Sequence, residues 1–94
     1  MTSEAEIWLA EAEAAWHFVT VPADLADEVR ARTAGRRPFN SVPVRATVGS
    51  TSWETSIFAD RKSGSYLLPV KATVRDREDV GAGDRVTVAL ELRE

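Results

Sequence analysis

The chain has 94 residues, of which 44% are hydrophobic and 29% are charged, as is typical of one globular domain with a modest core. Twelve Lys and Arg against fifteen Asp and Glu give a net charge of -3, whereas dedicated nucleic-acid-binding domains usually carry a basic excess. The absence of cysteine excludes disulfides, thiolate metal sites and cysteine nucleophiles.

The chain is expected to form a single domain over residues 1–94, with a loose tail at 1–4. No apolar run approaches the roughly 18–20 residues that a membrane-spanning helix needs. The N-terminus lacks the basic-then-apolar pattern of a signal peptide, so we expect a cytoplasmic location.

Two strands are predicted in the first 21 residues. Residues 6–13 alternate weakly and favour a strand, although their Ala and Glu content leaves a helix as the alternative. Residues 16–21 are aromatic and β-branched, which indicates a strand that Pro22 ends.

A helix is predicted over about 22–34. Pro22, Leu25, Ala26 and Val29 recur at helical spacing and form one apolar stripe. Proline at the start, an acidic first turn, a basic last turn and a glycine just beyond are typical helix-end signals.

The middle of the chain is predicted to form a β-hairpin. Residues 42–48 alternate, and Pro43 places that end at a sheet edge or a strand start because proline cannot donate a ladder hydrogen bond. Gly49-Ser50 fits a two-residue hairpin turn, and 51–58 is the returning strand.

The last thirty residues predict a strand at 65–68, a stop at Pro69, a short charged helix, a tight turn at 80–84 and a final strand at 85–92. The final strand alternates with period two. Its apolar face is formed by Val86, Val88, Leu90 and Leu92.

The two halves repeat one order of elements: strand, aromatic-containing strand, proline, helix, strand. Residue identity between the halves is poor, so the repeat is one of element order.

Several phrases resemble one bacterial and archaeal family, domain of unknown function 1905. They are Trp16-His17-Phe18-Val19-Thr20-Val21-Pro22, Ser41-Val42-Pro43-Val44, Trp53-Glu54-Thr55-Ser56, Tyr66-Leu67-Leu68-Pro69-Val70-Lys71 with Val74-Arg75, and Gly83-Asp84-Arg85-Val86. The resemblance implies a mainly β fold, a small six-stranded split β-barrel of the AbrB/MazE-like group with two short helices. The barrel would then consist of two strand-strand-helix-strand halves within one chain. The resemblance implies no activity.

No catalytic, metal or cofactor site is predicted. His17 is the only histidine and has no second His or Cys to complete a zinc site. The serines include no G-x-S-x-G motif. Gly81-Ala82-Gly83-Asp84 precedes a strand, unlike a phosphate-binding loop, so a turn explains it better. An enzyme is therefore the third-ranked hypothesis.

A small anionic ligand has one candidate site. Lys71 and Arg75 are spaced i, i+4 and share a helix face, which indicates either an anion site or a surface ion-pair row. Tyr66 precedes that helix, and Trp53 and Ser56 come from the preceding strand. Because Trp53 and Ser56 have opposite strand parity, both reach one pocket only if the strand ends or bulges between them.

A basic patch is the alternative candidate. Its members are Arg30, Arg32, Arg36, Arg37 and Arg45. They are either a solvated helix end or, if Arg45 joins the others in one surface, the basis of an AbrB-like DNA-binding regulator.

Three tryptophans are many for this length. Trp8, Trp16 and Trp53 predict core or barrel-end packing, and an exposed aromatic surface for a ligand or partner is the alternative.

The favoured function is a binding module for a small anion or a protein partner. We expect a monomer, because one chain supplies both halves of the barrel.

Overall fold

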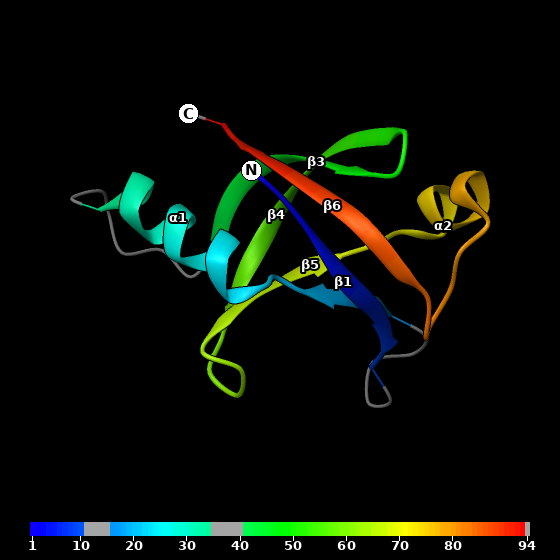
Figure 1. The fold of residues 1–94 in the computed structure, drawn as a ribbon, viewed down its shortest axis with the longest axis horizontal. Helices are drawn as coiled ribbons and strands as arrows, with labels where there is room; N and C mark the ends of the chain where they lie inside the picture. Colours follow the sequence, from blue (N-terminus) through cyan, green and yellow to red (C-terminus); the bar gives the residue numbers. More distant parts are fainter. Residues whose placement is uncertain (11–15, 35–40, 94) are drawn as a thin grey trace.

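The computed structural model describes residues 1–10, 16–34 and 41–93. In chain order the elements are β1 (Thr2–Leu9), β2 (His17–Thr20), α1 (Ala23–Thr33), β3 (Ser41–Val48), β4 (Thr51–Asp60), β5 (Ser65–Pro69), α2 (Ala72–Glu78) and β6 (Arg85–Leu92) (Figure 1). Within the described ranges, neither helix has the length and apolar character needed to cross a membrane.

The strands form a closed antiparallel barrel in the order β1-β2-β5-β4-β3-β6. This confirms the predicted mainly β barrel with two helices. If each strand of the first half is exchanged with its counterpart in the second half (β1 with β4, β2 with β5, β3 with β6), every strand keeps the same kind of neighbours. The two halves therefore occupy equivalent positions in the barrel.

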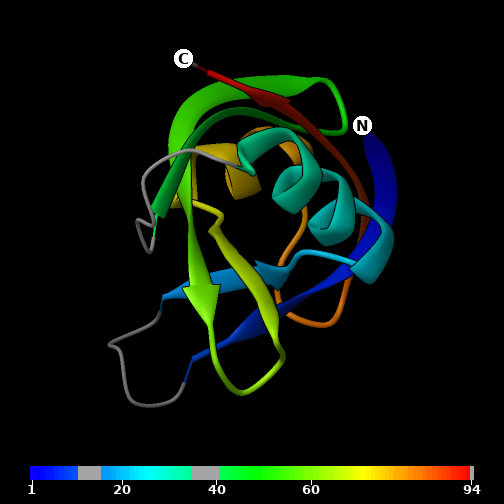
Figure 2. The same ribbon diagram turned by 90° about the vertical axis from the view of Figure 1, so that its left-hand side faces the viewer.

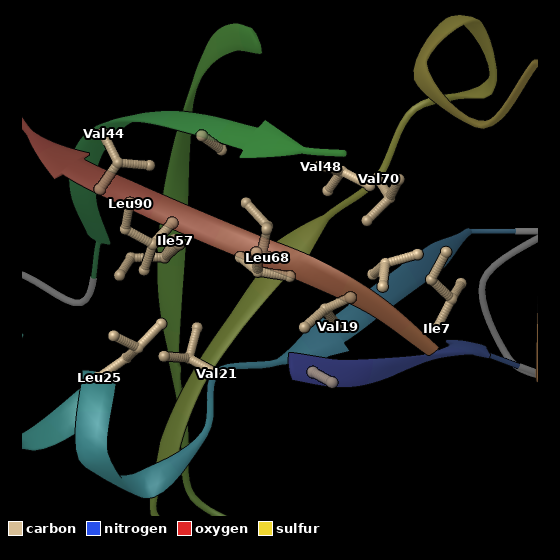
Figure 3. Packing of buried hydrophobic residues seen from close by; sticks show 14 of the residues in the cluster. Ile7, Val19, Val21, Leu25, Val44, Val48, Ile57, Leu68, Val70 and Leu90 are labelled. Carbon is tan, nitrogen blue, oxygen red and sulfur yellow. The ribbon is translucent and has the colours of Figure 1, made fainter. Parts of the chain in front are cut away.

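The core fills the barrel and extends under both helices. Inward residues alternate along each strand, and Ile7, Val19, Ile57 and Leu68 are fully buried (Figure 3). Leu25, Ala26 and Val29 of α1 close one end, while Val74 of α2 lies at the other. Figure 2 shows α1 across the near end of the barrel, with α2 behind it.

The N-terminal prediction needs a correction. Residues 1–4 are not a loose tail, because Thr2, Ser3 and Glu4 belong to β1 and pair with Ala89, Val88 and Thr87 of β6. This pairing covers the edge that residues 87–89 of β6 would otherwise expose. The predicted strand at 6–13 starts earlier than expected, and residues 11–13 lie outside the described ranges.

The other elements lie close to their predicted bounds. The helix expected over 22–34 spans Ala23–Thr33, and the final strand matches at both ends. Gly49 is the first central residue of the β3–β4 turn and has φ +61, a conformation that glycine adopts readily.

Candidate functional site

Four neighbouring strands each carry a large apolar side chain on the outer side of the barrel, beside a buried one. Trp8, Phe18, Phe58 and Leu67 each lie next in sequence to one of the fully buried residues Ile7, Val19, Ile57 and Leu68. Because strand side chains alternate, these four point out of the barrel. We define the aromatic face as the outward residues Trp8, Trp16, Phe18, Phe58, Leu67 and Pro69.

Cross-strand pairing brings the members of the aromatic face together. Phe18 pairs with Trp8 of β1 on one side and with Pro69 of β5 on the other. One step along, Leu67 of β5 pairs with Phe58 of β4. The result is an apolar stripe that runs diagonally across β1, β2, β5 and β4.

Three rings of the aromatic face form one cluster. The ring centroids of Trp8 and Phe18 lie 5.3 Å apart, and those of Trp16 and Phe18 lie 5.8 Å apart in a stacked arrangement. The Trp8 indole Nε1 donates a hydrogen bond of 3.0 Å to the Thr20 hydroxyl. That bond fixes the indole against the sheet and satisfies its polar atom.

Large apolar area remains accessible on this surface. Trp16 is 53% exposed and Phe58 is 45% exposed. Contiguous exposed apolar surface on a small soluble domain is typical of an interaction site. The aromatic face is therefore the feature of this molecule with the clearest capacity to bind.

Trp53 and Ser56 lie on opposite sides of β4. The β3–β4 register runs without interruption from Ser41↔Phe58 to Val48↔Thr51, so no bulge separates the two residues. Trp53 packs against the core, whereas Ser56 shares the outward parity of Phe58. These two residues therefore do not meet in one pocket.

Tyr66 lies at the other end of the barrel from Trp53. It pairs with Ala59, six residues along β4 from Trp53, which is about 20 Å of extended strand. The Arg30 guanidinium carbon lies 5.7 Å from the centroid of the Tyr66 ring, and Arg30 Nη2 donates to the Gly64 carbonyl. Tyr66 thus belongs to the contact between α1 and the β4–β5 hairpin.

Lys71 and Arg75 lie together at the start of α2 but in different environments. The Arg75 backbone N–H donates to the Lys71 carbonyl at 3.1 Å. The Arg75 side chain is half-buried and its Nε donates to the Val70 carbonyl at 3.1 Å. Lys71 is exposed. The predicted ligand residues are therefore divided among the barrel interior, its outer surface and its two ends.

The basic-patch residues lie beside carboxylates. On α1, Arg30 forms an ion pair with Asp27 at 3.1 Å, and Arg32 with Glu28 at 2.9 Å. On β3, Arg45 lies opposite Glu54 of β4 and Glu91 of β6. Arg36 and Arg37 lie outside the described residues.

Trp53 and His17 are half-buried residues that carry polar ring atoms. Trp53 Nε1 is buried and has no hydrogen-bond partner among the described residues. His17 is half-buried in β2, where its carbonyl accepts a hydrogen bond from the Val70 N–H at 2.9 Å. In the described part of the chain, no three His, Cys, Asp or Glu side chains are grouped to hold a metal ion.

Hydrogen bonds lower the pKa of one carboxylate near each end of β4. The pKa of Glu78 is lowered chiefly by the hydrogen bond from the Thr51 hydroxyl, with further bonds from Ser50. The pKa of Asp60 is lowered chiefly by the Ser63 hydroxyl, which donates at 2.7 Å. Glu78 thereby links α2 to the β3–β4 turn, and Asp60 stabilises the β4–β5 turn.

For Trp8 and Trp16 the sequence favours core or barrel-end packing, whereas the structure shows the alternative, an exposed aromatic surface. Sequence reasoning missed Phe18, Phe58 and Leu67. The available signal was a pair of apolar neighbours in each strand, since one of the two must face outward in a sheet. Only the strand order shows that these outward residues are adjacent.

The family comparison agrees with the resemblance seen in the sequence. No match was found among curated proteins. The model of the family described as a domain of unknown function, DUF1905, matches residues 4–90, nearly the whole chain. The chain therefore belongs to the DUF1905 family.

Proposed function

We propose that this protein is a binding module that contacts a protein partner through the aromatic face. The observation that carries the proposal is the outward position of Trp8, Trp16 and Phe18, whose rings form one cluster on the surface. Aromatic residues are enriched at protein interfaces because they bury large area at a small cost in conformational entropy.

The charges favour a protein partner over a nucleic acid. DNA binding depends on cations that are free to neutralise phosphates. Arg30 and Arg32 already pair with carboxylates of their own helix, and Arg45 lies between two glutamates of neighbouring strands. The net charge of -3 points the same way.

A small anion is the weaker candidate. Lys71 offers an exposed ammonium group, but the Nε of Arg75 is already used by the Val70 carbonyl. The aromatic face offers more area than these two side chains, so it carries the proposal.

Site-specific photo-crosslinking in the native cells tests this function. A photoreactive phenylalanine derivative at position 58 is expected to yield covalent protein adducts on irradiation. The matched control places the same derivative at Arg45, which is exposed on the outer side of β3. Adducts at position 58 and few at position 45 support the proposal, whereas no adducts at 58, or equal adducts at both, contradict it.

A further inference from the structure

We infer that the aromatic face pairs with a second copy of this chain, in a reversible dimer held by the apolar stripe and by Glu6–Lys71 contacts between copies. This inference rests on the proposed function and names its partner. It is carried by the positions of the charges beside the aromatic face.

Glu6 and Lys71 lie on opposite sides of the stripe, with Phe18 between them. Glu6 precedes Trp8 by two residues on β1, and Trp8 is one cross-strand partner of Phe18. Lys71 follows Pro69 by two residues, and Pro69 is the other partner. The ladder continues toward Lys71, because the Val70 N–H donates to the His17 carbonyl at 2.9 Å.

The two charges are displaced from Phe18 in opposite directions. β1 and β5 both run antiparallel to β2, so they are parallel to each other. Moving back along β1 and forward along β5 therefore leads away from Phe18 on opposite sides. With a strand spacing of about 4.8 Å and a rise of about 3.3 Å per residue, each charge lies roughly 8 Å from Phe18.

A twofold axis along the stripe makes this arrangement self-complementary. In a symmetric dimer the same surface is used by both copies, and a residue on one side of the axis meets the residue from the other side. An axis that passes through Phe18 along the stripe places Glu6 opposite the partner's Lys71, and Lys71 opposite the partner's Glu6. Each dimer then contains two opposite-charge contacts around a shared apolar centre.

Among the described residues, neither Glu6 nor Lys71 forms an ion pair within 4.0 Å. Arg85 lies opposite Glu6 in the β1–β6 register, but its Nε approaches Glu4, at 4.0 Å. Glu6 and Lys71 are both exposed. Both side chains are therefore available to a second copy.

The size of the surface indicates a weak, reversible dimer. The aromatic face has six residues, whereas a stable interface usually has about 20–30 residues on each side. The sequence predicts a monomer because one chain is enough to close the barrel. A dimer formed through the outer surface does not change that closure. Pairing through the outer surface adds a dimer at high concentration and leaves a folded monomer on dilution.

Sedimentation equilibrium with charge-reversed variants tests the inference. From about 5 µM to 500 µM, the wild-type mass should rise from one chain toward two. Glu6→Lys and Lys71→Glu should each weaken dimerisation on the order of tenfold, because each turns two attractive contacts into two repulsive ones. The combined variant should return to within about threefold of the wild type. Glu91→Lys, an exposed reversal on β6, is the control and should have no effect.

Circular dichroism and thermal unfolding of each variant separate loss of association from loss of folding. A wild-type mass of one chain up to 500 µM would overturn the inference. Dimerisation that ignores the single reversals, or that the combined variant fails to restore, would also overturn it. Photo-adducts at position 58 with a different protein, together with a monomeric wild type, would reject the second copy and retain the proposed function.

Discussion

The rings of Trp8 and Phe18 lie 5.3 Å apart on the outside of the barrel. Their sequence neighbours Ile7 and Val19 face the core and are fully buried. Paired aromatic residues on a sheet surface stabilise the strand pairing. Their position also leaves an apolar surface in contact with water, and this pair is the centre of the proposed interaction surface.

The alternation along β5 predicts very different costs for two neighbouring leucines. Leu68 is fully buried, so Leu68→Ala should lower the free energy of unfolding by roughly 2–5 kcal/mol. Leu67 points outward, so Leu67→Ala should cost about 1 kcal/mol or less. Chemical denaturation measures both, and equal costs would contradict the assigned faces.

Two glycines in similar backbone conformations should differ in their tolerance of alanine. Gly49 and Gly64 have φ of +61 and +73, so each alanine variant should lose about 1–2 kcal/mol of stability. At Gly49 the added Cβ would also collide with the Glu78 carboxylate, whereas nothing lies within 4 Å at Gly64. Gly49→Ala should therefore be the more destabilising.

The same pair tests the contact with Glu78. In a Glu78→Ala background, the extra cost of Gly49→Ala over Gly64→Ala should disappear, because the colliding group is gone. A double-mutant cycle measures this, and an unchanged difference would show that Glu78 is not the cause.

Acid should weaken the attachment of α2 to the β3–β4 turn. The hydrogen bonds from Thr51 and Ser50 lower the folded-state pKa of Glu78 below its ordinary value of 4.5. The unfolded chain therefore binds this proton more readily, so the stabilisation is present above pH 4.5 and is lost as the pH falls through the lower folded-state pKa.

Thermal unfolding from pH 7 to pH 3 measures the effect. Glu78→Gln should be less stable than the wild type at pH 7, and the difference should narrow in acid. The pKa of Asp60 is lowered in the same direction, so Asp60→Asn is a second acid-sensitive reference. A wild-type advantage that grows in acid would contradict the assignment.

Arg75 and Lys71 should separate into a structural residue and a surface residue. Arg75→Ala removes the bond from the half-buried Nε to the Val70 carbonyl and should cost about 1–2 kcal/mol. Lys71→Ala should change the free energy of unfolding by less than about 0.5 kcal/mol. Denaturant titration compares the two losses of stability. A larger loss for Lys71→Ala than for Arg75→Ala would contradict the structural role of Arg75.

Much of the fold follows from local patterns in the sequence. Proline at 22 and at 69, the apolar stripe of α1 and the period-two alternation of β6 predict the elements and their order. Barrel closure was implied by the family resemblance. The pairing of residues 2–4 could not be predicted from their composition, because it depends on the position of β1 beside β6 in the barrel.

The candidate site was less predictable, because it depends on strand order. Placing Lys71, Arg75, Trp53, Ser56 and Tyr66 together required a bulge in β4 and a short distance along it. The uninterrupted register excludes the bulge, and the pairing of Tyr66 with Ala59 excludes the short distance. The aromatic face unites residues from 8 to 69 because β2 and β5, distant in sequence, are neighbours in the barrel.

The most direct test of the account uses the three tryptophan indole N–H signals in a two-dimensional ¹H–¹⁵N NMR spectrum, assigned with single Trp→Phe variants. Trp8 and Trp16 lie on the aromatic face, whereas Trp53 packs against the core. From about 10 µM to 1 mM, the Trp8 and Trp16 signals should shift with concentration while the Trp53 signal stays fixed. Three fixed signals, or a shift confined to Trp53, would contradict the pairing of the aromatic face with a second copy.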